Sequence, residues 1–393
     1  MADRVADWVA LVAECYPPSD AQSWDRVGLQ VGAADDSVER VLVALDVTDA
    51  VLDEAAEVDA QLVLAHHPLL FRGLERLTED TPAGRLALRA ARERVAVLAA
   101  HTNYDVAARA TTDPIMDALG VTDARVLAPQ TDRDAEIVKL TTFVPTDAAD
   151  GVAAALSGAG AGVIGEYEQC TFRVSGIGTF KPSAAAQPAV GEREALNRVE
   201  EERLEVEVPR GALPAAVTAL KQAHPYEEVA YDVYALVDVE GRARHKGLGR
   251  VGELAEPRPL RAVADILAEA LPSPHLRVAG DLDAAVRRVA ACGGAGDSLI
   301  DAARAAGADV YVTGDLRHHP VLDALGAGLA LIDAGHYATE AAGLPELRRA
   351  VSERARTRGL SATLLASGVR TEPWADYRPP AAATKLTTTQ EPR

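Results

Sequence analysis

The sequence contains few aromatic residues and few cysteines, and each shortage excludes a class of protein. Aromatic residues make up 4% of the 393 residues, so any core must be built from aliphatic side chains. The three cysteines lie far apart without CxxC spacing, which excludes a disulfide scaffold and a zinc ribbon and favours a reducing cytoplasm. The amino-terminal stretch MADRVADWVALVAEC has no cationic start and no uninterrupted apolar run, so we expect an amphipathic helix there and no signal peptide or membrane span.

Basic residues are also in the minority. The chain has 40 Lys and Arg residues against 59 Asp and Glu residues, a net charge of -19. Nucleic acid and anionic membrane surfaces require a basic binding surface, so neither is an expected partner. An anionic small-molecule substrate would need a local positive charge, such as a bound metal ion.

The length of 393 residues suits two or three domains. The hydrophobic pattern predicts alternating strands and helices at both ends of the chain. RVLVALDV at 40–47 predicts a strand, 48–60 a helix and QLVLAHH at 61–67 a second strand, with a further helix before a strand from 94. The same alternation returns after about residue 250. The predicted fold class is therefore α/β, with two α/β segments forming a core with parallel-type sheets.

The middle of the chain has a different pattern. Its strands and helices follow in the order βαββαβ, which is typical of a ferredoxin-like α+β unit, and polar, turn-prone segments flank it. We therefore predict a discontinuous core of residues 1–131 and 248–377, interrupted by an insert at 132–247. The segment 378–393 lacks apolar periodicity and predicts a disordered tail.

Three groups of polar residues follow predicted strands. LAHHPLLF places His66 and His67 at a strand end, and AAHTNYD places His101 and Asp105 after the next strand. DAGHYATE starts a helix after a third strand, with His336 and Glu340 four residues apart on one helical face. A single histidine at a strand end is more often a hydrogen-bonded structural residue, and a His-Glu pair can simply stabilise a helix, but their combination favours a metal site.

Three histidines and two carboxylates are more ligands than one tetrahedral ion needs. Imidazole and carboxylate together suit zinc, iron or manganese, and bridging carboxylates allow two divalent ions per chain. The set is His66, His67, Asp105, His336 and Glu340, with His101, His318 and His319 in reserve. The glycine-rich stretch CGGAGDS at 292–298 predicts a turn between strand and helix, which is either a phosphate-binding turn or a tight turn with no ligand.

An ordered series of motifs resembles the Nif-three-like dinuclear-metal hexamer family, often labelled GTP cyclohydrolase I type 2 homologues. The motifs include SWDRVGLQVG, LAHHPLLF, HTNYD, CGGAGDSLI, VTGDLRHH and DAGHYATE, and they span nearly the whole chain. The resemblance places the metal ligands on the same five residues, with Glu340 as the bridge. It also implies that His101 and His319 lie near the metals as catalytic candidates.

The insert resembles the PII-like or CutA-like domain of longer family members, through HPYEEVAYDVY at 224–234. His224 is therefore expected to serve the insert and not the metal site. The resemblance further implies a homohexamer. Two stretches, VAARATTD and RHH, depart from the family's usual sequence near the expected substrate pocket.

Two functions remain open from the sequence. The first is a metal-dependent hydrolase, similar to a GTP cyclohydrolase, that acts on a nucleotide or another phosphorylated heterocycle in the cytoplasm. The second is a regulatory or metal-handling hexamer without turnover, in which the PII-like insert senses a ligand. A scaffold that binds protein partners is a third, plainer interpretation.

Overall fold

The structure, a computed structural model, describes residues 3–130, 136–165, 167–237, 246–272 and 276–375. The chain divides into two compact units. Unit 1 consists of Met1–Asp105, Arg109–Ala124 and Val251–Arg393, and unit 2 of Val106–Ala108 and Arg125–Arg250. The predicted insert, 132–247, lies within unit 2, and its ability to fold alone stays a prediction. The predicted tail, 378–393, lies outside the described residues.

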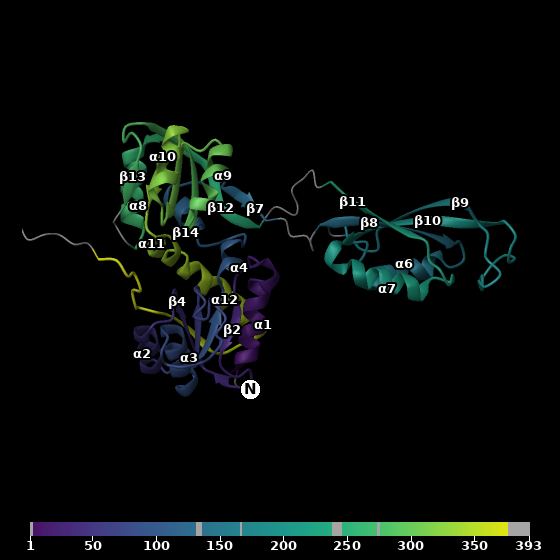
Figure 1. The fold of residues 1–393 in the computed structure, drawn as a ribbon, viewed down its shortest axis with the longest axis horizontal. Coiled ribbons are helices and arrows are strands. Elements are labelled where there is room, and N and C mark those ends of the chain that lie inside the picture. The colour runs from purple at the N-terminus through teal and green to yellow at the C-terminus, as the bar shows by residue number, and fades with distance from the viewer. Residues whose placement is uncertain (1–2, 131–135, 166, 238–245, 273–275, 376–393) are drawn as a thin grey trace, which may run out of the picture. The chain divides into compact units, whose positions relative to one another are not determined.

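A five-stranded sheet forms one part of unit 1 (Figure 1), with the order β17-β4-β5-β6-β2. The first four strands are parallel and β2 is antiparallel to β6. Every residue of β5 is buried, because helices cover both faces of the sheet. The strands are β17 (Thr363–Ala366), β4 (Arg40–Ala44), β5 (Leu62–Ala65), β6 (Ala96–Ala99) and β2 (Gly28–Val31), and the helices are α1 (Val5–Cys15), α2 (Asp49–Glu57), α3 (Pro82–Arg92) and α12 (Leu344–Arg358).

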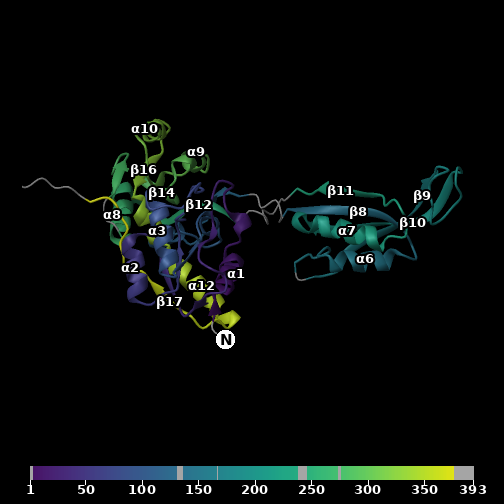
Figure 2. The same cartoon turned by 60° about the horizontal axis from the view of Figure 1, so that its bottom comes forward.

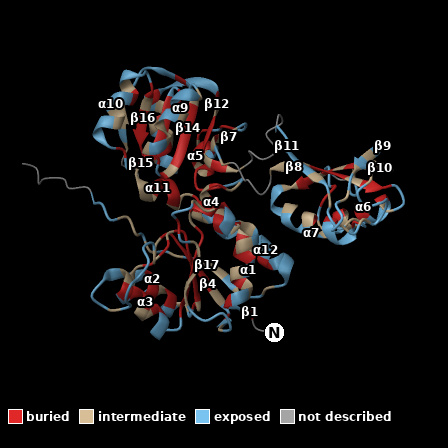
Figure 3. Cartoon of the chain, turned by 45° about the vertical axis from the view of Figure 1, so that its right-hand side comes forward, coloured by how far each residue is buried: buried red, intermediate tan, exposed pale blue. Residues whose placement is uncertain are grey.

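The six-stranded sheet has the order β13-β16-β15-β14-β12-β7. Its central strands β14, β15 and β16 are parallel, and β13 is antiparallel to β16. Figure 3 shows the buried residues along these strands, where they form an aliphatic core with α5 and α8. The strands are β13 (Arg277–Ala279), β16 (Ala330–Asp333), β15 (Val310–Gly314), β14 (Ala285–Ala295), β12 (Gly247–Pro259) and β7 (Arg125–Pro129), and the helices are α5 (Asp113–Ala118), α8 (Leu260–Ala270), α9 (Ile300–Ala305), α10 (His318–Gly326) and α11 (His336–Ala341).

Unit 2 contains an antiparallel sheet with the order β11-β8-β10-β9. The helices α6 (Ala149–Gly158) and α7 (Leu213–Ala223) pack on one face of this sheet (Figure 2), where they bury an aliphatic core. The elements follow one another as β8 (Ile137–Pro145), α6 (Ala149–Gly158), β9 (Thr171–Phe180), β10 (Asn197–Pro209), α7 (Leu213–Ala223) and β11 (Tyr231–Ala235). Their order is the βαββαβ order that the sequence pattern predicts for the middle of the chain.

The protein has a mixed α/β fold with several sheets, as its sequence predicts. The parallel pairing holds for the sheet centres, while the outer strands β2 and β13 are antiparallel. Within the described part of the chain, no helix combines the length and the hydropathy that crossing a membrane requires.

Candidate metal centre

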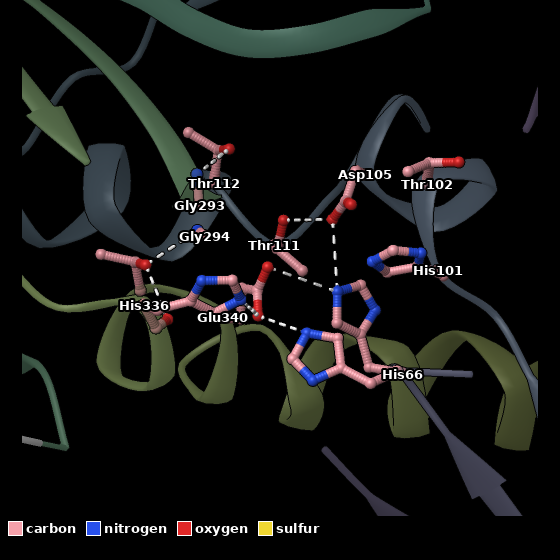
Figure 4. A network of polar contacts seen from close by, with 12 residues as sticks. His66, His101, Thr102, Asp105, Thr111, Thr112, Gly293, Gly294, His336 and Glu340 are labelled. Atoms are coloured by element: carbon pink, nitrogen blue, oxygen red, sulfur yellow. Dashed lines mark hydrogen bonds and ion pairs between the residues drawn. The ribbon is translucent and has the colours of Figure 1, made fainter. Parts of the chain in front are cut away.

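Three segments of unit 1 bring histidine and carboxylate side chains to one place (Figure 4). His66 and His67 directly follow β5. His101 precedes the short helix α4 (Thr102–Asp105), which follows β6, and Asp105 is the last residue of that helix. The third segment is α11, which carries His336 and Glu340 and comes after β16 of the other sheet. Because parallel strands end at one edge of a sheet, the first two segments converge, and α11 closes the site from the second sheet.

The carboxylate of Glu340 lies at the centre of this cluster. Its Oε2 is 2.8 Å from His67 Nε2 and 3.0 Å from His336 Nε2, and its Oε1 is 3.8 Å from His66 Nε2. The side chain of Glu340 is 5% exposed. Among the described residues, two groups have donor atoms close enough together to hold a metal ion: His66, His67 and His101, and His67, His336 and Glu340.

Each histidine of the cluster is oriented by a hydrogen bond at Nδ1. The partner is a carbonyl or carboxylate oxygen, which can only accept, so Nδ1 donates and Nε2 is the nitrogen left for a ligand. Metal-binding histidines show this arrangement, because the outer hydrogen bond fixes the ring and its tautomer. The four pairs are His66 with Ala100 O at 2.9 Å, His67 with Asp46 at 2.7 Å, His101 with Asp25 at 2.8 Å and His336 with Asp315 at 2.7 Å.

The buried groups shift one another's pKa values. Burial opposes ionisation of Glu340, but hydrogen bonds with the histidines hold the pKa of this carboxyl well below its usual range. Burial also opposes the charged form of His67, yet Asp46 and Glu340 raise the pKa of its imidazole to about 10. Glu340 and Asp315 similarly raise the pKa of His336 to about 9 against the effect of burial. Glu340 and the imidazoles of His67 and His336 therefore stabilise one another's charged forms.

Asp105 lies at the edge of the cluster. Its Oδ1 is 3.6 Å from His66 Nε2 and accepts a hydrogen bond from Thr111 Oγ1 at 2.6 Å. Burial raises the pKa of Asp105, although the charge of His66 opposes this shift. His66 Nε2, which faces Asp105 and Glu340, is buried without a hydrogen-bond partner. A cation between these groups would satisfy that nitrogen.

The first glycines of the stretch at 292–298 pack against the cluster. Gly293 and Gly294 lie in β14, and their amides donate to Thr112 Oγ1 at 3.0 Å and Thr339 Oγ1 at 2.9 Å. These two amides are already bonded and do not bind a phosphate, while the choice between a phosphate-binding turn and a plain tight turn at 295–298 stays open. Gly294 has a φ of +67°, and a Cβ there would lie 2.2 Å from Glu340 Oε1. The glycine thus leaves room for the central carboxylate.

The remaining predicted histidines lie elsewhere. His318 and His319 are exposed at the start of α10, and no contact between described residues joins either of them to the cluster. The catalytic role of His319 therefore stays a prediction. His224 is in unit 2, where its Nε2 lies 3.0 Å from Phe143 O and its Nδ1 accepts from Tyr226 N, as expected for a residue of the insert.

Sequence reasoning missed the acidic residues that orient the histidines. Asp46 and Asp315 follow buried strands, and Asp25 and Asp315 lie inside SWDRVGLQVG and VTGDLRHH, two motifs that carry the resemblance. A carboxylate after a buried strand was the available signal, but its partner histidine lies between 21 and 76 positions away along the chain. No spacing rule connects such pairs.

A cavity of about 960 Å³ opens beside the cluster. His67 and His336 form part of its wall, so a molecule in the cavity would contact the metal-binding groups. Other lining residues are Asp46, Asp315, Tyr337 and Trp374. This volume is suited to a small organic molecule.

The fold and the cluster together define an α/β protein with a histidine and carboxylate site that could hold metal. The chain belongs to the Duf34/NIF3 (NGG1p interacting factor 3) family, whose model matches residues 4–373. This result confirms the family resemblance drawn from the motifs.

Individual relatives agree with this assignment. The chain is 43% identical over 331 residues to the GTP cyclohydrolase 1 type 2 homolog of Bacillus subtilis, covering 84% of this chain and 87% of that protein. It is 41% identical over 377 residues to the Mycobacterium tuberculosis homolog of the same name, covering 95% and 97%. A crystal structure of a Bacillus cereus protein related to NIF3 has a TM-score of 0.76 at 38% identity and covers 96% of this chain and all (100%) of that one.

Proposed function

We propose that unit 1 binds two divalent transition-metal ions through His66, His67, Asp105, His336 and Glu340. Glu340 carries the proposal, because its buried oxygens face different imidazoles, as a bridging carboxylate requires. Five nitrogen and oxygen donors exceed the needs of one tetrahedral ion. The mixture of imidazole and carboxylate suits zinc, iron or manganese.

The hydrogen bonds behind the ligands support this proposal. Asp46, Asp315 and Ala100 O hold the Nδ1 atoms, so the Nε2 atoms of three histidines are directed toward one carboxylate. Without a cation, His66 Nε2 stays buried and unsatisfied, which is unfavourable. The donor set therefore fits a metal pair.

The proposed reaction is hydrolysis of a nucleotide or another phosphorylated heterocycle. The names of the relatives make GTP the first substrate to test. Two bound metal ions would supply Lewis-acid activation of water and substrate. Asp25 holds His101 at Nδ1, which leaves His101 Nε2 to accept or donate a proton beside the cluster. His319 is a second catalytic candidate that rests on the resemblance alone.

A regulatory or metal-handling assembly is the second candidate. Unit 2 favours it, because its elements follow one another in the order βαββαβ of a ferredoxin-like, PII-like domain. The two strands that precede its helices, β8 and β10, are the inner strands of its sheet. This unit also has a cavity of its own, of about 680 Å³, that could accept a ligand. A ligand bound there would regulate the assembly without any turnover at the metal site.

The homohexamer is a separate proposal that rests on the family resemblance. None of the described cysteines, Cys15, Cys170 and Cys292, forms a disulfide, which supports a reducing, cytoplasmic location. Sedimentation of the full chain tests the assembly, and a monomer at micromolar concentration would contradict it.

The function is tested by elemental analysis followed by turnover assays. We expect about two ions per chain after reconstitution with zinc, iron or manganese, and GTP hydrolysis that a chelator abolishes and one preferred metal restores. A stoichiometry at or below one ion in every case contradicts the metal pair. A fully loaded protein without chelator-sensitive turnover, but with a ligand bound to unit 2, would replace the hydrolase with the regulatory assembly.

A further inference from the structure

Two exposed aromatic side chains, Trp24 and Phe71, lie beside the metal cluster. Trp24 is 53% exposed and Phe71 is 46% exposed, and their rings meet edge to face with centroids 5.7 Å apart. The chain has only three tryptophans and four phenylalanines. Single exposed apolar residues are ordinary, but two large aromatic side chains in contact at the surface of a site indicate a binding surface.

The aromatic pair contacts the cluster through His101. The ring centroid of His101 is 6.1 Å from that of Trp24 and 6.3 Å from that of Phe71. On the cluster side, the same ring is 5.2 Å from His66 and 5.5 Å from His67. A single imidazole therefore separates the pair from the metal-binding nitrogens, and a flat molecule that rests on the pair can reach the cluster with its edge.

The bonds that orient His101 also hold the pair in place. Asp25, next to Trp24, is buried and accepts from Thr102 N at 3.0 Å while it holds His101 Nδ1 at 2.8 Å. The segment that leads to Phe71 is fixed by Leu70 N, which donates to Gln30 Oε1 at 2.8 Å. The binding surface is therefore preorganised, which reduces the entropy lost when a ligand binds.

Two arginines adjoin the pair in the sequence. Arg26 follows Asp25 and Arg72 follows Phe71, and both are exposed. Within the described ranges, Arg72 forms no ion pair, so its charge is available to a ligand. Arg26 donates to Asp25 O at 3.2 Å, so in a chain with a net charge of -19 Arg72 is the cation on these two segments that favours an anionic ligand group.

We propose that Trp24 and Phe71 bind the planar aromatic heterocycle of a substrate that also carries an anionic group. The inference rests on the proposed function, because it names the part of the substrate that the metal site presents for reaction. Aromatic side chains bind the π face of a heterocycle by stacking, largely independently of its hydrogen-bonding edge. Both side chains then determine specificity, and neither takes part in the chemistry.

The test compares GTP with inorganic triphosphate, which has a similar anion but no ring. Binding of both probes to the metal-loaded full chain is measured by titration calorimetry for Trp24→Leu, Phe71→Leu and Trp24→Phe. We expect each leucine variant to lose about 10-fold in GTP affinity, the order of one stacking contact, with triphosphate binding unchanged. Trp24→Phe should retain most of the affinity. The matched control is Phe172→Leu, which removes a phenylalanine that is 65% exposed in unit 2.

Three results would overturn the inference: unchanged GTP affinity in both leucine variants, an equal loss for triphosphate, or a change in sedimentation that identifies the pair as a contact between copies of this chain. Metal content is measured for every variant, so that loss of ions is not mistaken for loss of stacking. A protein without turnover that still loses ring-dependent affinity in Trp24→Leu would contradict the hydrolase but support the aromatic site.

Discussion

The chain contains two histidine pairs, His66–His67 and His318–His319, that look alike in sequence and differ in structure. Both follow a buried strand that pairs in parallel with its neighbours, and the ring centroids within each pair are 5.0 Å and 5.2 Å apart. His66 is fully buried, whereas His318 and His319 are exposed. The spacing of two histidines therefore does not decide whether they can bind metal.

The difference lies in the oxygen atoms behind the rings. His66 and His67 each have an acceptor at Nδ1, namely Ala100 O and Asp46, so both Nε2 atoms have a fixed direction. Among the residues described by the structure, neither His318 nor His319 has such an acceptor. An imidazole that rotates freely loses conformational entropy when it binds an ion, and an oriented one does not.

Replacement of Glu340 by glutamine should reduce metal binding at the His66–His67 pair more than the other variants proposed below. The change keeps the size of the side chain but removes the charge that three imidazoles face. We expect the loss of both ions, with affinity reduced by about 100-fold or more, measured by elemental analysis after dialysis against a metal buffer.

The control for Glu340→Gln is the double variant His318→Ala/His319→Ala. It removes two histidines and should leave the metal content unchanged, because both side chains are exposed and lie outside the cluster. Loss of ions in the double variant would show that His318 and His319 bind metal, which contradicts the distinction between the two histidine pairs.

The variant Asp46→Asn tests the role of the outer acceptor. The amide has the shape of the carboxylate but is a weaker acceptor for His67 Nδ1, so the ring loses part of its orientation. We expect metal affinity to fall by about 10- to 100-fold with the fold intact. Asp323→Asn, an exposed residue on α10 near the second pair, is the matched control. Equal affinities in the two variants would contradict the argument from Nδ1.

Much of the site could be predicted from sequence, because its ligands follow strands whose order along the chain is simple. His66, His67, Asp105, His336 and Glu340 each stand at or just after the carboxyl end of a strand or on the helix that follows it, and the hydrophobic pattern located those strands. The acceptors Asp25, Asp46 and Asp315 were not predicted, since their pairing depends on tertiary distances. The surroundings of the glycine run could not be predicted for the same reason: only the structure shows that Thr112 and Thr339 accept hydrogen bonds from the amides of Gly293 and Gly294.

Gly294→Ala should produce an intermediate effect. The φ of +67° is unfavourable for alanine, and the new Cβ would lie 2.2 Å from Glu340 Oε1, so the central carboxylate must move. We expect metal affinity to fall by about 10-fold, together with a lower melting temperature. Gly326→Ala on α10 is the control, because a Cβ there meets nothing within 4 Å and the site is unaffected. If Gly294→Ala binds metal normally, Glu340 has more freedom than the packing indicates.

Removal of the insert should have the smallest effect on metal binding. All ligands and all Nδ1 acceptors of the cluster belong to unit 1, so replacing residues 132–246 with a short glycine-serine linker should leave about two ions per chain by elemental analysis.

Asp105 is the ligand that this deletion is most able to displace. The next residue, Val106, accepts a hydrogen bond at its carbonyl oxygen from Gly247 N at 2.9 Å. The linker must therefore end before Gly247 and keep Arg250, which donates to Ala107 O at 2.6 Å. A second deletion that also removes Gly247 and Arg250 should weaken metal binding, because Asp105 is displaced while the other ligands keep their positions. If the first deletion already unfolds the chain or loses its ions, the insert stabilises the core. The difference in metal binding between the two histidine pairs would then depend on unit 2 as well as on unit 1.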